Sequence, residues 1–228
     1  MRKGLTISGI VIIILCVLSQ LVLPVIASRT VASRLNVLLD TQDVKADISS
    51  VPALLLALGH IGSLDVTAEH GRLGKVRIES MHLTGDGVSL DLGELSSGRF
   101  AISSADRLEL IGVVTEANLE EYLEKSVKKL KNAKVTMTPE GVRATGQLTL
   151  LGKAADVSLE GTFEAADEGI YLRTRRVQIK NSRLGRNLNM NLFTDFLIVD
   201  VNKIKLPLTA DEVVMEKGRA IVRTSYRH

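Results

Sequence analysis

Residues 115–150 read TEANLEEYLEKSVKKLKNAKVTMTPEGVRATGQLTL, and a helical pattern gives way within them to a strand pattern. In the first half, one face follows the i, i+3, i+4, i+7, i+8, i+11 series typical of an amphipathic helix. Its members are Leu119, Tyr122, Leu123, Ser126, Val127 and Leu130. After the turn residues Pro139-Glu140-Gly141, apolar and polar residues alternate with the period of a strand. This stretch predicts an α+β fold in which a helix packs against antiparallel strands.

The ends of this helix are also predicted. Thr115 is a good N-cap residue, so we expect the helix to begin at Glu116. Glutamates occupy its first half and lysines its second, an order that complements the helix dipole. The spacing predicts i,i+4 pairs between Glu121 and Lys125 and between Glu124 and Lys128. We therefore expect the helix to span residues 116–132.

Strand patterns extend outward on both sides of the helix. Period-two alternation covers residues 61–112 and resumes over residues 135–180. Glycine-containing turns punctuate it at residues 70–71, 85–87, 97–98, 139–141, 167–169 and 217–218. Residues 204–226 predict the last strands, and a short helix is one interpretation of residues 188–196. The expected architecture is a long, curved, barrel-like antiparallel sheet around one or two amphipathic helices.

The beginning of the chain is a different element. Residues 5–27 read LTISGIVIIILCVLSQLVLPVIA, and residues 4–28 contain no charged side chain. A run of this length is sufficient for a membrane-spanning helix. The basic Arg2 and Lys3 and the small-residue ending at Ala27 also fit a cleavable signal peptide. Residues 1–27 are thus a signal anchor or a signal peptide, and residues 28–228 a single extracytoplasmic domain. The protein would be a single-pass protein of the cytoplasmic membrane, or secreted or periplasmic if the segment is removed.

Two more helices are predicted between this segment and the strands. In residues 28–39, the spacing of Val31, Leu35, Leu38 and Leu39 predicts a helix that continues from the apolar segment or soon after it. Residues 44–49 alternate as a strand does. Pro52 and Gly59 then bracket a helix of one to two turns in residues 52–59.

Composition argues against several functions. Without Arg2 and Lys3, the basic residues of positions 1–27, the chain has 27 basic against 26 acidic side chains, a net charge of +1. Nucleic-acid binding requires a sustained basic excess, so we expect none. The single cysteine lies in the apolar segment, and the four histidines lack metal-ligand spacing, so we expect no metal site. No nucleophile-elbow or phosphate-loop motif is present. We expect no enzyme and no cofactor.

One segment is strongly basic. Six basic residues and no acidic residue occur within residues 173–186; they are Arg173, Arg175, Arg176, Lys180, Arg183 and Arg186. Guanidinium groups suit phosphate, so one interpretation is contact with phospholipid head groups or an anionic polymer. The other is a solvated strand face balanced by Glu160, Glu164, Asp167 and Glu168. Both interpretations remain open.

The layout resembles the LmeA-like family of bacterial envelope phospholipid-binding proteins. The family's mid-chain helix pattern T-x-x-x-L-x-x-x-L is matched by Thr115, Leu119 and Leu123. Its I-x-L-P-L strand is matched by Ile204, Leu206, Pro207 and Leu208, and the hairpin that follows by Val213, Gly218 and Val222. The resemblance implies a fold similar to the tubular lipid-binding superfamily, with a curved sheet around a helix and a groove for acyl chains. It implies lipid binding without catalysis.

The function we expect is therefore non-catalytic binding of a phospholipid or other acyl lipid at the outer face of the cytoplasmic membrane. The groove would be lined by Leu54, Leu55, Leu58, Leu119, Leu123 and Val127. Head groups would contact Arg173, Arg175, Arg176 and Lys180. The alternative is a structural or assembly module that binds an envelope protein or an anionic polymer, and a solidly packed body without a groove would favour it.

Overall fold

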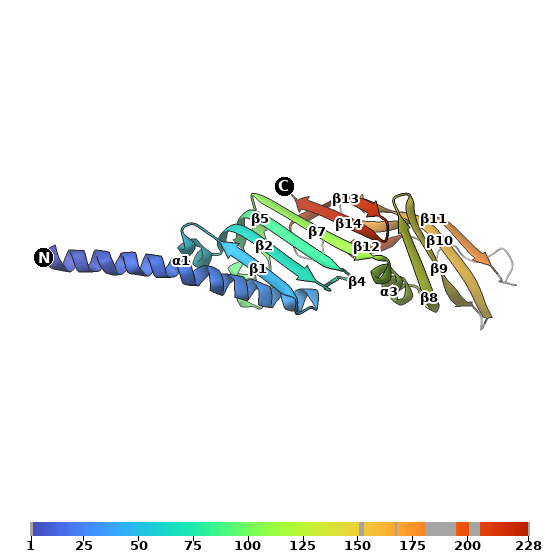
Figure 1. Ribbon diagram of the computed structural model, residues 1–228, viewed down its shortest axis with the longest axis horizontal. Coiled ribbons are helices and arrows are strands. Elements are labelled where there is room, and N and C mark those ends of the chain that lie inside the picture. The colour runs from blue at the N-terminus through green and yellow to red at the C-terminus, as the bar shows by residue number, and fades with distance from the viewer. Residues whose placement is uncertain (1, 151–152, 167, 181–194, 201–205, 228) are drawn as a thin grey trace. The chain divides into compact units, whose positions relative to one another are not determined.

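A computed structural model describes residues 2–150, 153–166, 168–180, 195–200 and 206–227 (Figure 1). The chain divides into two compact units. Unit 1 comprises Met1–Ala68 and His82–Glu109, and unit 2 comprises Glu69–Met81 and Leu110–His228. The fold is α+β and dominated by antiparallel strands, as the alternating pattern predicted.

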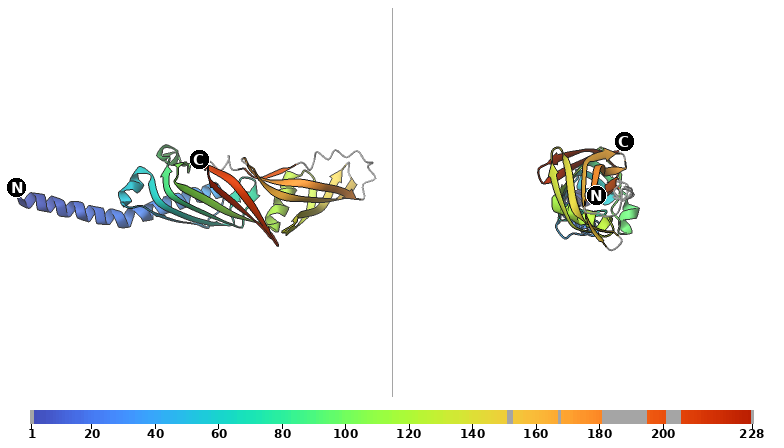
Figure 2. Two further views of the ribbon diagram at one scale, coloured as in Figure 1. Left: turned by 90° about the horizontal axis from the view of Figure 1, so that it is seen from above. Right: turned by 90° about the vertical axis from the view of Figure 1, so that its right-hand side faces the viewer.

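Helix α1 (Arg2–Leu39) is the longest element and belongs to unit 1. Figure 2 shows it as one continuous helix. Pro24 lies inside it and does not end it. Among the residues whose side chains are described, Val17–Leu39 is long and apolar enough to cross a membrane. However, Val31, Leu35 and Leu39 are buried against the body of unit 1. The part of α1 after Ser28 is therefore anchored in unit 1 by one face, whereas Leu21, Val25 and Ile26 before it are exposed.

The sheet of unit 1 packs against the second half of α1. Its strand order is β1-β2-β5, with β6 beside β5. The elements are β1 (Val44–Ser49), η1 (Ala53–Leu58), β2 (His60–Glu69), β5 (Ser80–Leu90), α2 (Leu92–Ser96), β6 (Ile102–Ser104) and β7 (Arg107–Thr115), and β2, β5 and β7 also contribute residues to unit 2. Alternate residues of β2, such as Leu64 and Val66, are buried, as the period-two pattern predicted.

Unit 2 contains a five-stranded antiparallel sheet in the order β12-β11-β10-β9-β8. Its strands are β8 (Leu130–Thr138), β9 (Gly141–Leu150), β10 (Lys153–Ala166), β11 (Gly169–Lys180) and β12 (Phe196–Asp200). The remaining elements are β3 (Arg72–Leu73), β4 (Val76–Arg77), α3 (Glu116–Ser126), β13 (Leu208–Glu216) and β14 (Arg219–Tyr226). The pair β13–β14 is the hairpin predicted around Gly218.

Helix α3 contacts both edges of the five-stranded sheet, which therefore curves around it (Figures 1 and 2). At one edge, the backbone amides of β8 donate to glutamates of α3. At the other edge, the hydroxyl of Tyr122 donates to the carbonyl oxygen of Leu197 in β12 at 2.9 Å. The predicted curved sheet around an amphipathic helix is confirmed in this unit.

The predicted C-terminus of α3 was wrong. The helix ends at Ser126, and Leu130 is already the first residue of β8. Glu121 pairs with Lys125 as expected. Glu124 does not pair with Lys128 and instead accepts a hydrogen bond from the amide of Ala133 at 2.8 Å. Edge-strand pairing of residues 130–138 with β9 outweighs the helical propensity of the lysine-rich segment.

The turn predicted at residues 85–87 was also wrong. Strand β5 continues through it, with Gly87 at φ +58° and the Asp86 carbonyl oxygen accepting from the amide of Asp106. Leu92, which falls within the predicted alternation of residues 61–112, begins α2 instead, and Asp91 caps that helix. Pro52 is the N-cap of η1 rather than its first residue, while Gly59 ends it as predicted. The helix expected around residues 188–196, apart from its end, and Ile204 lie outside the described residues.

Candidate anion-binding hollow and apolar surfaces

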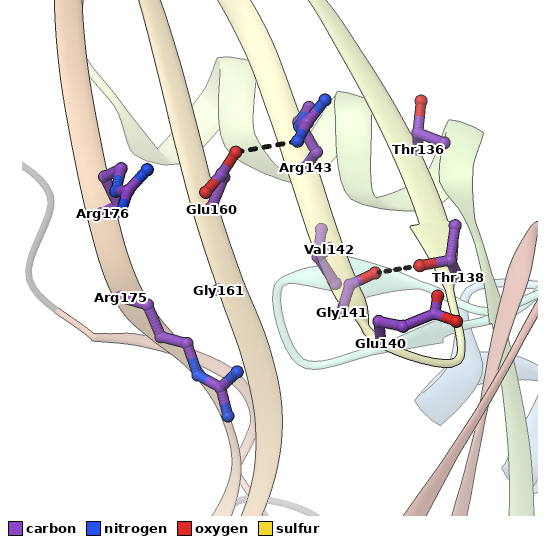
Figure 3. Close-up of a pocket in the computed structure, with 10 residues that line it drawn as sticks. All are labelled: Thr136, Thr138, Glu140, Gly141, Val142, Arg143, Glu160, Gly161, Arg175 and Arg176. Carbon is purple, nitrogen blue, oxygen red and sulfur yellow. Dashed lines mark hydrogen bonds and ion pairs between the residues drawn. The ribbon is translucent and has the colours of Figure 1, made fainter.

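A β-bulge in unit 2 places two consecutive arginines on one face of the five-stranded sheet. Glu160 of β10 is opposite Arg176 of β11, whereas the next residue, Gly161, is opposite Thr174. Arg175 therefore has no partner on β10, and the bulge turns it toward the face that carries Arg176. Both side chains are exposed. Figure 3 shows them on the face that also carries Arg143 of β9.

These side chains surround a hollow of about 580 Å³, which we call the arginine hollow. It is lined by Thr136, Thr138, Glu140, Gly141, Val142, Arg143, Glu160, Gly161, Arg175 and Arg176 (Figure 3). Two of the lining residues are glycines in close contact with a neighbouring strand. A Cβ on Gly161 would lie 2.4 Å from the carbonyl oxygen of Arg173, and one on Gly141 would lie 2.7 Å from that of Gly161. Neither position has room for a side chain.

The charges of the arginine hollow are only partly balanced. Arg143 pairs with Glu160, with Nη2 and Oε1 2.9 Å apart. Within the described residues, Arg175 and Arg176 have no ion pair or hydrogen-bonding side-chain partner. Two guanidinium groups and the hydroxyl of Thr136 are therefore available to an anion, whereas the hydroxyl of Thr138 donates to the carbonyl oxygen of Gly141 at 3.4 Å.

The other two basic residues predicted to meet head groups differ in their surroundings. Arg173 pairs with Asp195 and Glu164, at 2.5 Å and 3.0 Å, and lies 4.8 Å from the ring centre of Tyr171. Its hydrogen bonds to Asp195 and then to Glu164 raise its pKa. Lys180 lines a second hollow, of about 560 Å³, farther along the same face. The structure therefore brings Arg175 and Arg176 together with Arg143 and engages Arg173 with two carboxylates.

Arg143 was not among the residues predicted from the sequence. It lies more than 30 positions before Arg175, on a different strand. The signal available was the polar face of its strand, which Arg143 shares with Thr145 and Gln147. That face becomes part of a basic site only through the register between β9, β10 and β11.

The predicted groove residues lie in two different units. Leu119, Leu123 and Val127 belong to unit 2, where they are at most 5% exposed between α3 and the strands. The two apolar spaces described in this interior measure about 10 Å³ each, whereas pockets that bind small molecules are typically about 300–1,000 Å³. Leu123 and Val127 line one of these spaces. The interior of unit 2 is closely packed in this conformation.

Leu54, Leu55 and Leu58 belong to unit 1, on the short helix η1. Leu54 and Leu58 are each 62% exposed, and Leu55 is half-buried. Their exposure distinguishes them from the three buried residues of α3. The two sets do not form one continuous lining within either unit.

Comparison with known proteins identifies one family. A model described as LmeA-like phospholipid-binding matches residues 18–225, nearly the whole chain. No curated protein and no solved structure gives a significant match. Among the described residues, no group of three or more His, Cys, Asp or Glu side chains is placed to hold a metal ion.

Proposed function

Because the chain belongs to the LmeA-like phospholipid-binding family, we propose that it is a non-catalytic phospholipid-binding protein of the bacterial cell envelope. The family match over residues 18–225 is the observation that carries the proposal. Helix α1 would hold the body at the outer face of the cytoplasmic membrane, because its apolar first part and the part that packs against the strands of unit 1 form one continuous helix. Removal of residues 1–27 would instead release the body as a diffusible periplasmic carrier.

The arginine hollow is the proposed site for the phosphate of the head group. Arg175 and Arg176 supply charge that the described carboxylates leave unpaired, and the bulge holds them side by side. Arginine donates in a planar fork that matches phosphate oxygens, so a pair of guanidiniums favours a lipid whose head group carries a phosphate, and most of all one with a net negative charge. Lys180 extends the basic surface into the neighbouring hollow. Arg173 would support the site structurally, since its charge is already shared with two carboxylates.

The proposed acyl-chain site is the apolar face of α3. Leu119, Leu123 and the C-cap residue Val127 form it. The two spaces described in this interior measure about 10 Å³ each, and Leu123 and Val127 line one of them. A fatty-acyl chain is far larger than these spaces, so uptake requires α3 to separate from the five-stranded sheet. A phospholipid with a photoreactive acyl chain tests this site. Cross-links in the peptides of α3 and β8 are expected, and cross-links confined to α1 would contradict it.

Native mass spectrometry of the full chain, released from detergent, tests lipid binding itself. We expect a species that carries anionic phospholipid at defined stoichiometry. The double variant Arg175→Ala/Arg176→Ala should bind the lipid at least about tenfold more weakly in a lipid titration, since removing two charge-assisted contacts costs more than about 1.4 kcal/mol. The matched control is Arg219→Ala/Arg223→Ala, which removes the same charge from β14.

The two possible failures have different meanings. If no phospholipid is bound by the parent chain, the proposed function is wrong. If lipid is bound and both double variants lose it equally, the function stands and the head-group site is elsewhere.

The close packing of unit 2 favours a second candidate, a structural or assembly module of the envelope. An interior with spaces of about 10 Å³ suits a rigid body that binds a partner on its surface. In that case the arginine hollow would meet an anionic polymer or an acidic surface of an envelope protein. In-cell cross-linking from position 176 that recovers protein or polymer, and no lipid, would favour this candidate.

A further inference from the structure

We propose that η1 and the start of α2 form a membrane-contact surface that inserts into the interfacial layer of the same bilayer that α1 crosses. The surface, which we call the η1 patch, consists of Val51, Leu54, Leu58 and Leu92. The proposal rests on the proposed function in one respect, namely that α1 lies in a membrane.

The η1 patch is unusually exposed for apolar residues. Val51 is 89% exposed, Leu54 and Leu58 are each 62% exposed, and Leu92 is 44% exposed. Single exposed leucines are normal on protein surfaces, but a contiguous group marks an interaction site. Val51, Leu54 and Leu58 fall within eight consecutive residues, and Leu92 joins them because it lies against Gly59, the residue that ends η1. A Cβ on Gly59 would lie only 3.0 Å from Cδ2 of Leu92.

The path of the chain places the η1 patch where the apolar part of α1 ends. After Leu39 the chain turns, and β1 runs back along α1 (Figure 1). The amide of Ile48 donates to Oγ of Ser28 at 3.1 Å, so the end of β1 lies beside Ser28. Val51 follows three residues later, within about 10 Å along an extended chain. Ser28 is also the last residue of the charge-free run of α1.

The composition of the η1 patch fits lipid better than a protein partner. Residues 48–59 contain no charged side chain, and the carboxylate of Asp91, beside Leu92, is engaged by the amide of Glu94 as the cap of α2. A protein-binding surface, in contrast, normally has a polar rim that fixes its partner. The exposed Arg29 follows Ser28 on α1, at the level where lipid phosphates would lie. Interfacial apolar helices sink about 5–10 Å into the boundary between head groups and acyl chains. Side chains that emerge beside a membrane-crossing helix are positioned for this depth.

Spin labels on the full chain in lipid nanodiscs test the proposal. The body contains no cysteine, so replacing Cys16 by Ser leaves a background for single labels at Leu54→Cys or Leu58→Cys. Power saturation compares collisions with oxygen, which is enriched in lipid, and with a water-soluble nickel chelate. The nanodiscs contain phosphatidylcholine and phosphatidylglycerol. Substitution of these exposed leucines should leave the fold intact, which circular dichroism checks.

Two reference positions on α1 calibrate the labels. Ile26→Cys reports the apolar part, where Ile26 is 55% exposed. Val37→Cys is the matched control, because Val37 is apolar and 81% exposed but lies nine residues past Ser28, about 14 Å farther along the helix. We expect the labels at positions 54 and 58 to resemble the label at position 26, with more oxygen and fewer nickel collisions than at position 37.

The outcomes separate this proposal from the proposed function. If the labels at positions 54 and 58 behave like the label at position 37 while position 26 reports lipid, the η1 patch does not enter the bilayer and the inference is wrong. If position 26 also reports water, α1 is not in the membrane, and both the inference and the membrane placement fail. Phospholipid binding by unit 2 is measured separately, by mass spectrometry, and stands or falls without these labels.

Discussion

At the scale of single residues, leucines in the two units are expected to contribute very differently to the free energy of unfolding. Leu119 of α3 is fully buried, whereas Leu54 of η1 is 62% exposed. We predict that Leu119→Ala lowers the free energy of unfolding by about 2–5 kcal/mol, through lost burial and the cavity left behind. Leu54→Ala should change it by less than about 0.5 kcal/mol. Urea unfolding of the full chain in detergent measures both, and equal losses would contradict the packing described here.

Gly161 is the residue on which the bulge beside the arginine hollow depends. A Cβ there would lie 2.4 Å from the carbonyl oxygen of Arg173, too close for any relaxed contact. We predict that Gly161→Ala lowers the free energy of unfolding by about 1–3 kcal/mol, because the two strands must move apart. Gly112→Ala is the matched control, since no atom lies within 4 Å of its Cβ position. If Gly161→Ala leaves the melting temperature unchanged in thermal unfolding, the bulge does not need glycine.

At the scale of elements, α3 protects the free edge of the five-stranded sheet. Glu116, Glu120 and Glu124 accept hydrogen bonds from the amides of Met137, Val135 and Ala133, at 2.7, 2.9 and 2.8 Å. The match is geometric. Four helical residues rise about 6.0 Å and two strand residues about 6.6 Å. A glutamate at every fourth position of the helix therefore meets every second amide of the strand. Exposed strand edges invite pairing with other chains, and these carboxylates occupy this edge.

The Glu120 carboxylate gives this arrangement a clear test. We predict that Glu120→Ala lowers the free energy of unfolding by about 1–3 kcal/mol, because the half-buried amide of Val135 loses its acceptor. Glu120→Gln keeps an acceptor oxygen and should lose less. Both variants also lose the exposed pair with Lys134, so their difference isolates the hydrogen bond. Hydrogen exchange at the Val135 amide should accelerate only in Glu120→Ala, and equal exchange in both variants would disprove the role.

Tyr122 links α3 to β12, at the other edge of the five-stranded sheet, and is expected to make the free energy of unfolding depend on pH in the alkaline range. Burial raises the pKa of its hydroxyl, which donates to the carbonyl oxygen of Leu197. Below the unfolded tyrosine pKa of about 10, both states hold the proton and the contribution is complete. As the pH rises through 10 toward the folded pKa, the unfolded state releases its proton first and stability falls. Tyr122→Phe should be less stable at neutral pH, but its stability should fall less steeply above pH 10. Parallel slopes in denaturant titrations would contradict this.

The elements that the sequence predicted best were those fixed by local periodicity. The start of α3 after its N-cap Thr115 and the strand alternation in β9 and β10 follow from local sequence alone, and the structure confirms them. The errors arose where pairing with distant strands outweighs local preference. The glycines at residues 85–87 look like a turn, yet β5 runs through them beside β7. The lysines after Ser126 look helical, yet residues 130–138 form the edge strand that the glutamates of α3 cap.

At the scale of the whole chain, the arginine hollow shows what a single sequence leaves out. The basic residues of β11 are evident in the sequence. Which of them form ion pairs, however, depends on residues far away in the sequence. Asp195 engages Arg173 across 22 residues, and the register of β9, β10 and β11 brings Arg143 to Arg176. Neither relation has a local signal, because a one-residue bulge decides which side chains share a face.

The fate of the apolar segment determines whether the whole molecule is tethered or diffusible. Ala27 and Ser28 lie inside α1, and Ser28 accepts a hydrogen bond from the amide of Ile48, so a protease would have to unwind ordered helix to reach this peptide bond. We predict that the chain is retained intact, at 24.7 kDa, in the membrane fraction, and that alkaline carbonate does not extract it. Intact-mass measurement on protein from its native membrane checks this. The comparison is a Ser28→Pro variant, in which proline breaks the helix at the junction. A soluble product that begins at Ser28 in the parent chain would show that the body is a diffusible carrier, and it would remove the fixed position beside the bilayer on which the η1 patch depends.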